Sequence, residues 1–160
     1  MTTVDTVMTR ITQAVTVFRA GDRDRARATL LEIWTEVGAA GDPLHRCTLA
    51  HYAADTFDDP AEALVWDIRA LDAAEALTDT RLDDHHAGLQ VAGFYPSLHL
   101  NLADNFRRLG SFAAATRHID AARACLHVLP DDAYGSMIRR AVTEVAASII
   151  AHETDKRPTP

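Results

Sequence analysis

The chain has 160 residues, of which 48% are hydrophobic and 24% charged, enough for one globular domain with its own core. A formal net charge of -7 argues against nonspecific binding to nucleic acid or to an anionic membrane, because the long-range field of the protein repels both. There are two cysteines, no apolar run at the N-terminus and no stretch of about 20 apolar residues. These features favour a cytoplasmic protein with free thiols and with neither nucleic acid nor membrane as a partner.

Apolar residues recur at helical spacing along nearly the whole chain, which predicts an all-α fold. Turn-forming residues divide this pattern at Gly21-Asp22, Gly41-Asp42-Pro43, Asp58-Asp59-Pro60, Gly93 to Pro96, Gly110-Ser111 and Pro130-Asp131. The expected helices lie near residues 4–20, 23–38, 43–57, 60–77, 80–92, 96–109, 111–128 and 131–152.

Three pairs of these helices share one spacing, which indicates an internal repeat. A residue near the end of each first helix stands nine positions before an alanine of the second helix: Val17 and Ala26, Ala54 and Ala63, Phe106 and Ala115. A glycine suited to a tight turn stands five positions before that alanine in two of the pairs, at Gly21 and Gly110. The third pair also carries a large residue, Leu-Ala and an aromatic at the spacing of His99, Leu102-Ala103 and Phe106.

On these residues the chain resembles the tetratricopeptide-repeat family, in particular its short bacterial members, over about residues 8–130. The resemblance implies a right-handed stack of antiparallel helix hairpins, near residues 4–38, 43–77 and 96–128. It also implies a concave side that binds ligands, often peptides. The alanines at 63 and 115 are farther apart than the family repeat of about 34 residues, which predicts an inserted short helix near 80–92.

The C-terminal part is expected to close the stack. Residues 131–152 carry apolar side chains on one helix face and are predicted to form a capping helix for the last hairpin. Residues 1–152 are therefore expected to form a single domain. The polar segment 153–160 contains two prolines and is expected to be a flexible tail.

A polar stripe runs along the helix expected at 96–109. It consists of Ser97, Asn101, Asp104 and Arg108. First helices line the concave side in the family, so the resemblance implies a ligand-binding groove here. Asparagine and arginine can hold a carboxylate or a peptide backbone. Further candidates for this groove are His45, Tyr52, Asp55 and Tyr95. The alternative for each residue is an ordinary solvated helix face.

Four further side chains occupy repeat positions that are usually small or apolar: Cys47, His51, Asp67 and His99. These positions face neighbouring helices, and a buried Asp67 requires a partner, for which the histidines are suited. In one interpretation a hydrogen-bonded Asp–His pair fixes the packing. In the other the cluster lines a pocket, either as an acid–base site or as a metal site of all four residues. We expect His51, Asp67 and His99 to lie within about 8 Å of one another.

The common catalytic signatures are absent from the sequence. The leading hypothesis is therefore a helical-repeat module, not an enzyme and without a cofactor, that binds a protein or peptide partner or a small anionic ligand in its groove. The alternative is a small enzyme, or a ligand or metal sensor, that uses the His/Asp/Cys cluster. A third hypothesis, an oligomerisation adaptor such as a homodimer, requires an exposed apolar patch.

Overall fold

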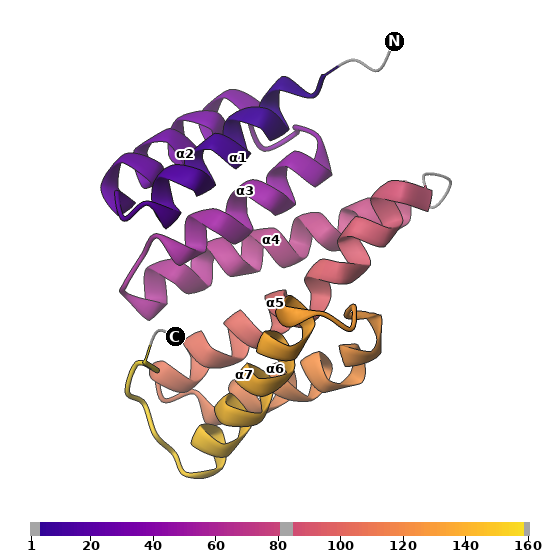
Figure 1. Cartoon of the computed structure of the whole chain (residues 1–160). Helices are drawn as coiled ribbons and strands as arrows, with labels where there is room; N and C mark the ends of the chain where they lie inside the picture. Colours follow the sequence, from indigo (N-terminus) through magenta and orange to yellow (C-terminus); the bar gives the residue numbers. More distant parts are fainter. Residues whose placement is uncertain (1–3, 81–84, 159–160) are drawn as a thin grey trace. The chain divides into compact units, whose positions relative to one another are not determined.

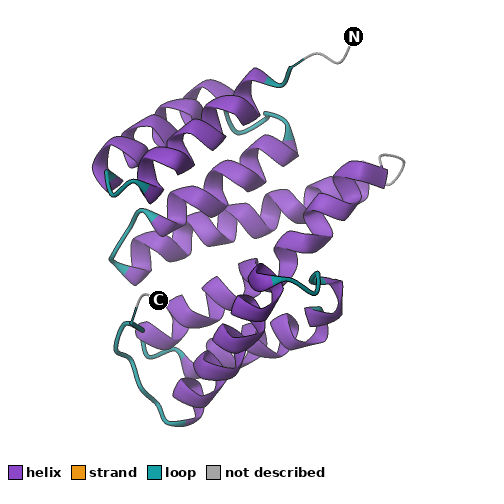
Figure 2. Ribbon diagram, in the orientation of Figure 1, coloured by secondary structure: helices purple, strands orange, loops and turns teal. Residues whose placement is uncertain are grey.

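The structure, a computed structural model, describes residues 4–80 and 85–158. All regular elements of this part are helical (Figures 1 and 2). They are α1 (Thr6–Arg19), α2 (Arg23–Val37), α3 (Pro43–Asp55), α4 (Pro60–Thr80), α5 (His85–Arg108), α6 (Phe112–Ala124), the 3-10 helix η1 (Leu126–Val128) and α7 (Ala133–Ile150). The all-α prediction is thus confirmed for the described residues, among which no helix is long and apolar enough to cross a membrane.

The sequence predicts one domain over residues 1–152, whereas the contacts within the chain gather in two compact units, Met1–Asp83 and Asp84–Pro160. In the first unit α1 packs on α2, α2 on α3 and α3 on α4. In the second unit α6 and α7 both pack on α5 and on each other. Successive helices joined by short turns run antiparallel within each unit (Figure 1).

Aspartate side chains define where helices begin. Asp5, Asp22, Asp42 and Asp132 each accept a hydrogen bond from a backbone N–H two or three residues later, at the starts of α1, α2, α3 and α7. These bonds satisfy donors that the first helical turn leaves without a partner. Pro43 fits the first turn of α3 because its missing N–H is not needed there.

Three helices end in the same way. The chain adopts a left-handed conformation after α1 at Gly21 (φ 100°), after α5 at Gly110 (φ 75°) and after α7 at His152 (φ 55°). The following residue then donates its N–H to a carbonyl of the last helical turn: Asp22 to Val17, Ser111 to Phe106 and Glu153 to Ser148. Glycine reaches this conformation without steric cost, which confirms the two turn glycines expected from the sequence.

The alanines of the shared hairpin spacing lie inside the helix packing. Ala26, Ala63 and Ala115 have exposed fractions of 0%, 6% and 0%. Their small side chains let the second helix of each pair approach the first closely. The expected hairpin seams are therefore confirmed at the level of these residues.

One expected boundary needs correction. Helix α5 begins at His85 and continues without a break through Gly93 and Pro96 to Arg108, where the sequence suggests two helices, 80–92 and 96–109. A proline inside a helix removes one backbone donor and costs about 3 kcal/mol. Pro96 and the next two residues, Ser97 and Leu98, are buried, so packing offsets this cost.

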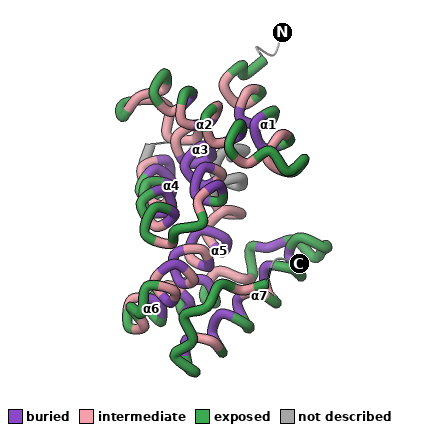
Figure 3. The backbone as a smooth tube through the Cα atoms, turned by 90° about the vertical axis from the view of Figure 1, so that its left-hand side faces the viewer, coloured by how far each residue is buried: buried purple, intermediate pink, exposed green. Residues whose placement is uncertain are grey.

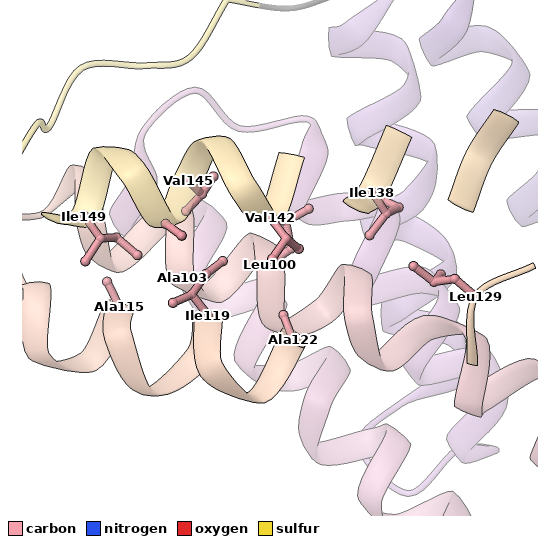
Figure 4. Close-up of a cluster of buried hydrophobic side chains, with 11 residues drawn as sticks. Leu100, Ala103, Ala115, Ile119, Ala122, Leu129, Ile138, Val142, Val145 and Ile149 are labelled. Carbon is pink, nitrogen blue, oxygen red and sulfur yellow. The ribbon is translucent and has the colours of Figure 1, made fainter. Parts of the chain in front are cut away.

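The core of the second unit joins α5, α6 and α7 (Figure 4). It consists of Leu100, Ala103, Ala115, Ile119, Ala122, Leu129, Ile138, Val142, Val145, Ala146 and Ile149. Buried positions recur along one side of α7, as its predicted apolar face requires (Figure 3). Helix α7 therefore covers the hairpin formed by α5 and α6.

In the first unit two tryptophan rings pack against each other and against the side chain of an arginine; we call this group the aromatic centre. The rings of Trp34 in α2 and Trp66 in α4 meet edge to face with centroids 5.1 Å apart. The guanidinium of Arg69 lies 4.5 Å from the Trp66 ring and 5.6 Å from the Trp34 ring. Such contacts join α2 to α4 by dispersion and by attraction between the cation and the ring faces.

Candidate functional site

The first candidate cluster lies in the first unit. Cys47 and His51 stand one turn apart on α3, and Asp67 stands on α4, the partner helix of the hairpin. Their exposed fractions are 0%, 7% and 1%, so all three side chains are buried as the repeat pattern predicts. Burial raises the pKa of the Cys47 thiol to about 12 and lowers the pKa of His51 to about 4.

These pKa values limit the chemistry of the cluster. At neutral pH the Cys47 thiol keeps its proton, and a thiol is a weak nucleophile and metal ligand until it is ionised. His51 stays neutral, and its low pKa makes it a weak general base. No group of three or more His, Cys, Asp or Glu side chains within residues 4–80 and 85–158 is arranged to hold a metal ion. His99 belongs to the second unit, and its approach to His51 and Asp67 stays a prediction.

The partner of His99 inside its own unit is a histidine that the sequence interpretation missed. His99 Nδ1 on α5 lies 3.2 Å from His118 Nδ1 on α6. The ring centroids are 5.5 Å apart and the ring planes differ by 28°, so the rings meet edge to edge through these nitrogens. One Nδ1 must carry the hydrogen and the other must accept it, and the two imidazoles therefore hold opposite tautomers.

Two more rings extend this pair into a row of four. Tyr95 lies beside His99 with centroids 6.2 Å apart, and Phe106 lies beside His118 at 5.5 Å. Burial lowers the pKa of His99 and, together with the charges of His99 and Arg117, the pKa of His118. The pair is therefore biased towards neutrality, in which one ring has a bare Nε2 and the other an Nε2–H. Such a pair can accept one hydrogen bond from a ligand and donate another.

The polar stripe of α5 is only partly accessible. Ser97, which was expected to line the groove, is buried, with an exposed fraction of 6%. Asn101, Asp104 and Arg108 are half-buried and follow one another along the helix. The Asp104 carboxylate accepts hydrogen bonds from Nε and Nη2 of Arg107, at 2.9 and 2.6 Å.

The corresponding residues of α3 have separate surroundings. His45 Nε2 lies 2.7 Å from Asp5 Oδ2, a contact that joins α3 to the start of α1 and lowers the pKa of Asp5. Tyr52 is half-buried. Asp55 reaches solvent, yet desolvation by the protein around it raises its pKa to about 6.

A buried arginine at the end of α5 is a second feature that the sequence interpretation missed. Arg107 is 1% exposed and lies next to Arg108, which was the expected ligand residue. Its Nη1 donates to the carbonyl of Glu153 at 2.7 Å and its Nη2 to the carbonyl of Asp155 at 2.9 Å. The segment expected to be a flexible tail thus has defined contacts with α5.

Similarity gives no help in choosing among these sites. No protein-family model, no curated protein and no solved structure matches the chain. Two local signals point to the missed residues. His118 stands three positions after the seam residue Ala115, on the side of α6 that packs against α5, and Arg107 stands three positions after Asp104, the spacing of a helical ion pair.

Proposed function

We propose that the chain is a helical-repeat binding module of the tetratricopeptide type, located in the cytoplasm, that holds a peptide segment or a small anionic ligand on α5. Two observations support the repeat assignment. The seam alanines at 26, 63 and 115 are buried, and the turns before the first and third of them contain left-handed glycines. A right-handed stack of the hairpins is the arrangement that this repeat would produce.

The polar stripe of α5 carries the proposal of ligand binding. Asn101 and Arg108 are seven positions apart and so lie on the same helix face, two turns from each other. Asp104 lies between them, but its carboxylate is engaged by Arg107. An anion that approaches this face therefore meets the guanidinium of Arg108 and the amide of Asn101 with little repulsion from Asp104.

The buried cluster supports binding in preference to catalysis. A protonated thiol at Cys47 and a neutral imidazole at His51 suit dense packing between α3 and α4. Neither group has the pKa near neutrality that general acid–base catalysis favours. The fold alone does not decide the function, so the binding face has to be tested directly.

Selection of a displayed peptide library on the intact protein, followed by titration of the selected peptides, tests this proposal. We expect Arg108→Ala to weaken binding about tenfold, the equivalent of one charged hydrogen bond. Arg140→Ala, which removes an exposed arginine from α7, is the matched control and should bind like the native protein. Added salt should weaken native binding more than binding by Arg108→Ala, because an exposed charge contact is screened. Equal affinity of the native and Arg108→Ala proteins would overturn the proposal.

A further inference from the structure

The segment after α7 lies on the second unit in the manner of a bound peptide. Arg107 donates to the main-chain carbonyls of Glu153 and Asp155, which are two residues apart in the sequence. Residues 151–156 are themselves exposed, whereas Arg107 is almost completely buried. The segment therefore covers the arginine without entering the core.

The Asp104 carboxylate holds the arginine in position for this contact. It accepts from Nε and Nη2, which leaves Nη1 and the second hydrogen of Nη2 directed at the segment. The arginine recognises carbonyl oxygens and makes no contact with the side chains of Glu153 or Asp155 in these bonds. Any peptide main chain that presents the carbonyls of residues i and i+2 to the arginine offers the same chemistry.

Two contacts flank the covered arginine and hold the segment down. The His152 ring lies on the Phe112 ring of α6, with centroids 4.3 Å apart and planes 6° apart. Arg157 is paired with Glu144 of α7. Among the described residues His152 is the one non-glycine with a positive φ, and it stands where the equivalent endings of α1 and α5 have Gly21 and Gly110. A left-handed backbone conformation is strained for histidine, and the contact between the His152 and Phe112 rings offsets this strain.

We propose that Arg107 is the centre of a binding site for the main chain of a peptide, and that residues 153–157 are a displaceable strap that occupies it. His152 is the latch of this strap. The inference deepens the proposed function, on which it rests, because it names a peptide main chain as the ligand class and the chain itself as a competitor. Release of the strap exposes the oriented guanidinium next to Asp104 and Arg108.

The test uses the full chain and a fluorescein-labelled peptide with the sequence of residues 152–158, HETDKRP. The latch variant combines His152→Gly with Arg157→Ala. Glycine keeps the left-handed helix ending and removes only the ring. Thr154→Ala changes an exposed side chain of the strap and is the matched control. Fluorescence anisotropy measures binding, and amide hydrogen exchange of residues 154–157 measures release of the strap.

We expect faster exchange in the latch variant and binding of the peptide at least ten times tighter than to the native or Thr154→Ala protein. Arg107→Lys added to the latch variant should return binding to the native level, because an ammonium lacks the paired donors. If circular dichroism shows that the latch variant with Arg107→Lys does not fold, Asp104→Asn is used in place of Arg107→Lys, because it weakens the contact that orients the arginine. Unchanged hydrogen exchange or unchanged peptide binding in the latch variant would overturn the inference. So would tighter peptide binding that persists after the added Arg107→Lys or Asp104→Asn substitution in a folded protein. Arg108 is kept in every variant, so Arg108-dependent binding of selected peptides would still stand.

Discussion

The histidines of this chain differ because their surroundings differ. His51 is buried in α3 with a pKa lowered to about 4, while His45 two turns earlier pairs with Asp5 at the protein surface. The pair formed by His99 and His118 is half-buried between α5 and α6. Protonation of His51, His99 or His118 destabilises the folded protein, because burial disfavours the charged form of these rings.

His51 should make the protein less stable in mild acid. Its folded pKa of about 4 lies below the unfolded value of about 6.5, so the unfolded chain binds the proton first as the pH falls. The free energy of unfolding should therefore decline from pH 6.5 towards pH 4, with a contribution of up to about 1.4 kcal/mol per pH unit from this residue. His51→Gln should flatten the profile in this window, measured by urea unfolding at a series of pH values. Parallel profiles for the two proteins would refute the assignment.

The contact between His99 and His118 should be visible in their titration. The charge of His99 is one cause of the lowered pKa of His118, after burial itself. His99→Gln removes that charge, so the pKa of His118 should rise while staying below its ordinary value. Two-dimensional NMR of the imidazole nitrogens follows both the pKa and the tautomers. A fall in the pKa of His118 in this variant would show that the two rings do not interact as the 3.2 Å contact requires.

The surroundings of individual residues in the candidate sites were predictable only where a sequence pattern indicated them. The burial of Cys47, His51 and Asp67 was predicted from the spacing of the proposed repeat, in which those positions face other helices. The partner of His99 was predictable only in part. The position of His118 three residues after Ala115 places it on the side of α6 that faces α5, but no spacing in the sequence pairs it with His99. The role of Arg107 depends on carbonyls 46 and 48 residues away, and no local spacing encodes such a contact.

At the scale of helices, the seam of the third hairpin offers a direct test. Ala115 is fully buried between α5, α6 and α7. Ala115→Leu should overpack this seam and lower the free energy of unfolding by about 1–3 kcal/mol. Ala113→Leu, at an exposed position of the same helix, is the control and should change stability by less than about 0.5 kcal/mol. Equal stabilities of the two variants, measured by urea unfolding, would show that the seam is placed incorrectly.

Helix starts and turns were predictable because their signals are local. Asp22 and Asp42 cap helices as expected, and Gly21 and Gly110 supply left-handed turns. The course of α5 was not predictable, because a glycine and Pro96 within four residues normally end a helix. The burial of Pro96, Ser97 and Leu98 overrides that local preference, and such packing exists only in the folded chain.

For the molecule as a whole, composition and periodicity were enough to predict the all-α class, but not the division into two compact units. The hydrophobic period of a helix reports which side is buried and does not report against which helix it packs. The inserted segment before the third hairpin therefore looked like an added element within one domain. That segment contains the boundary between the compact units Met1–Asp83 and Asp84–Pro160, and the single domain over residues 1–152 stays a prediction.

The aromatic centre of the first unit has a practical consequence for fluorescence measurements of unfolding. Both tryptophans, Trp34 and Trp66, belong to residues 1–83, and the second unit contains none. Intrinsic tryptophan emission therefore reports on the first unit alone, while far-UV ellipticity reports on the helices of both units. In a Cys47→Ala variant, Cys125 of the second unit is the one remaining thiol, and its reaction with a chromogenic disulfide reports on that unit. That single variant, without any added label, thus gives one signal for the unfolding of each unit.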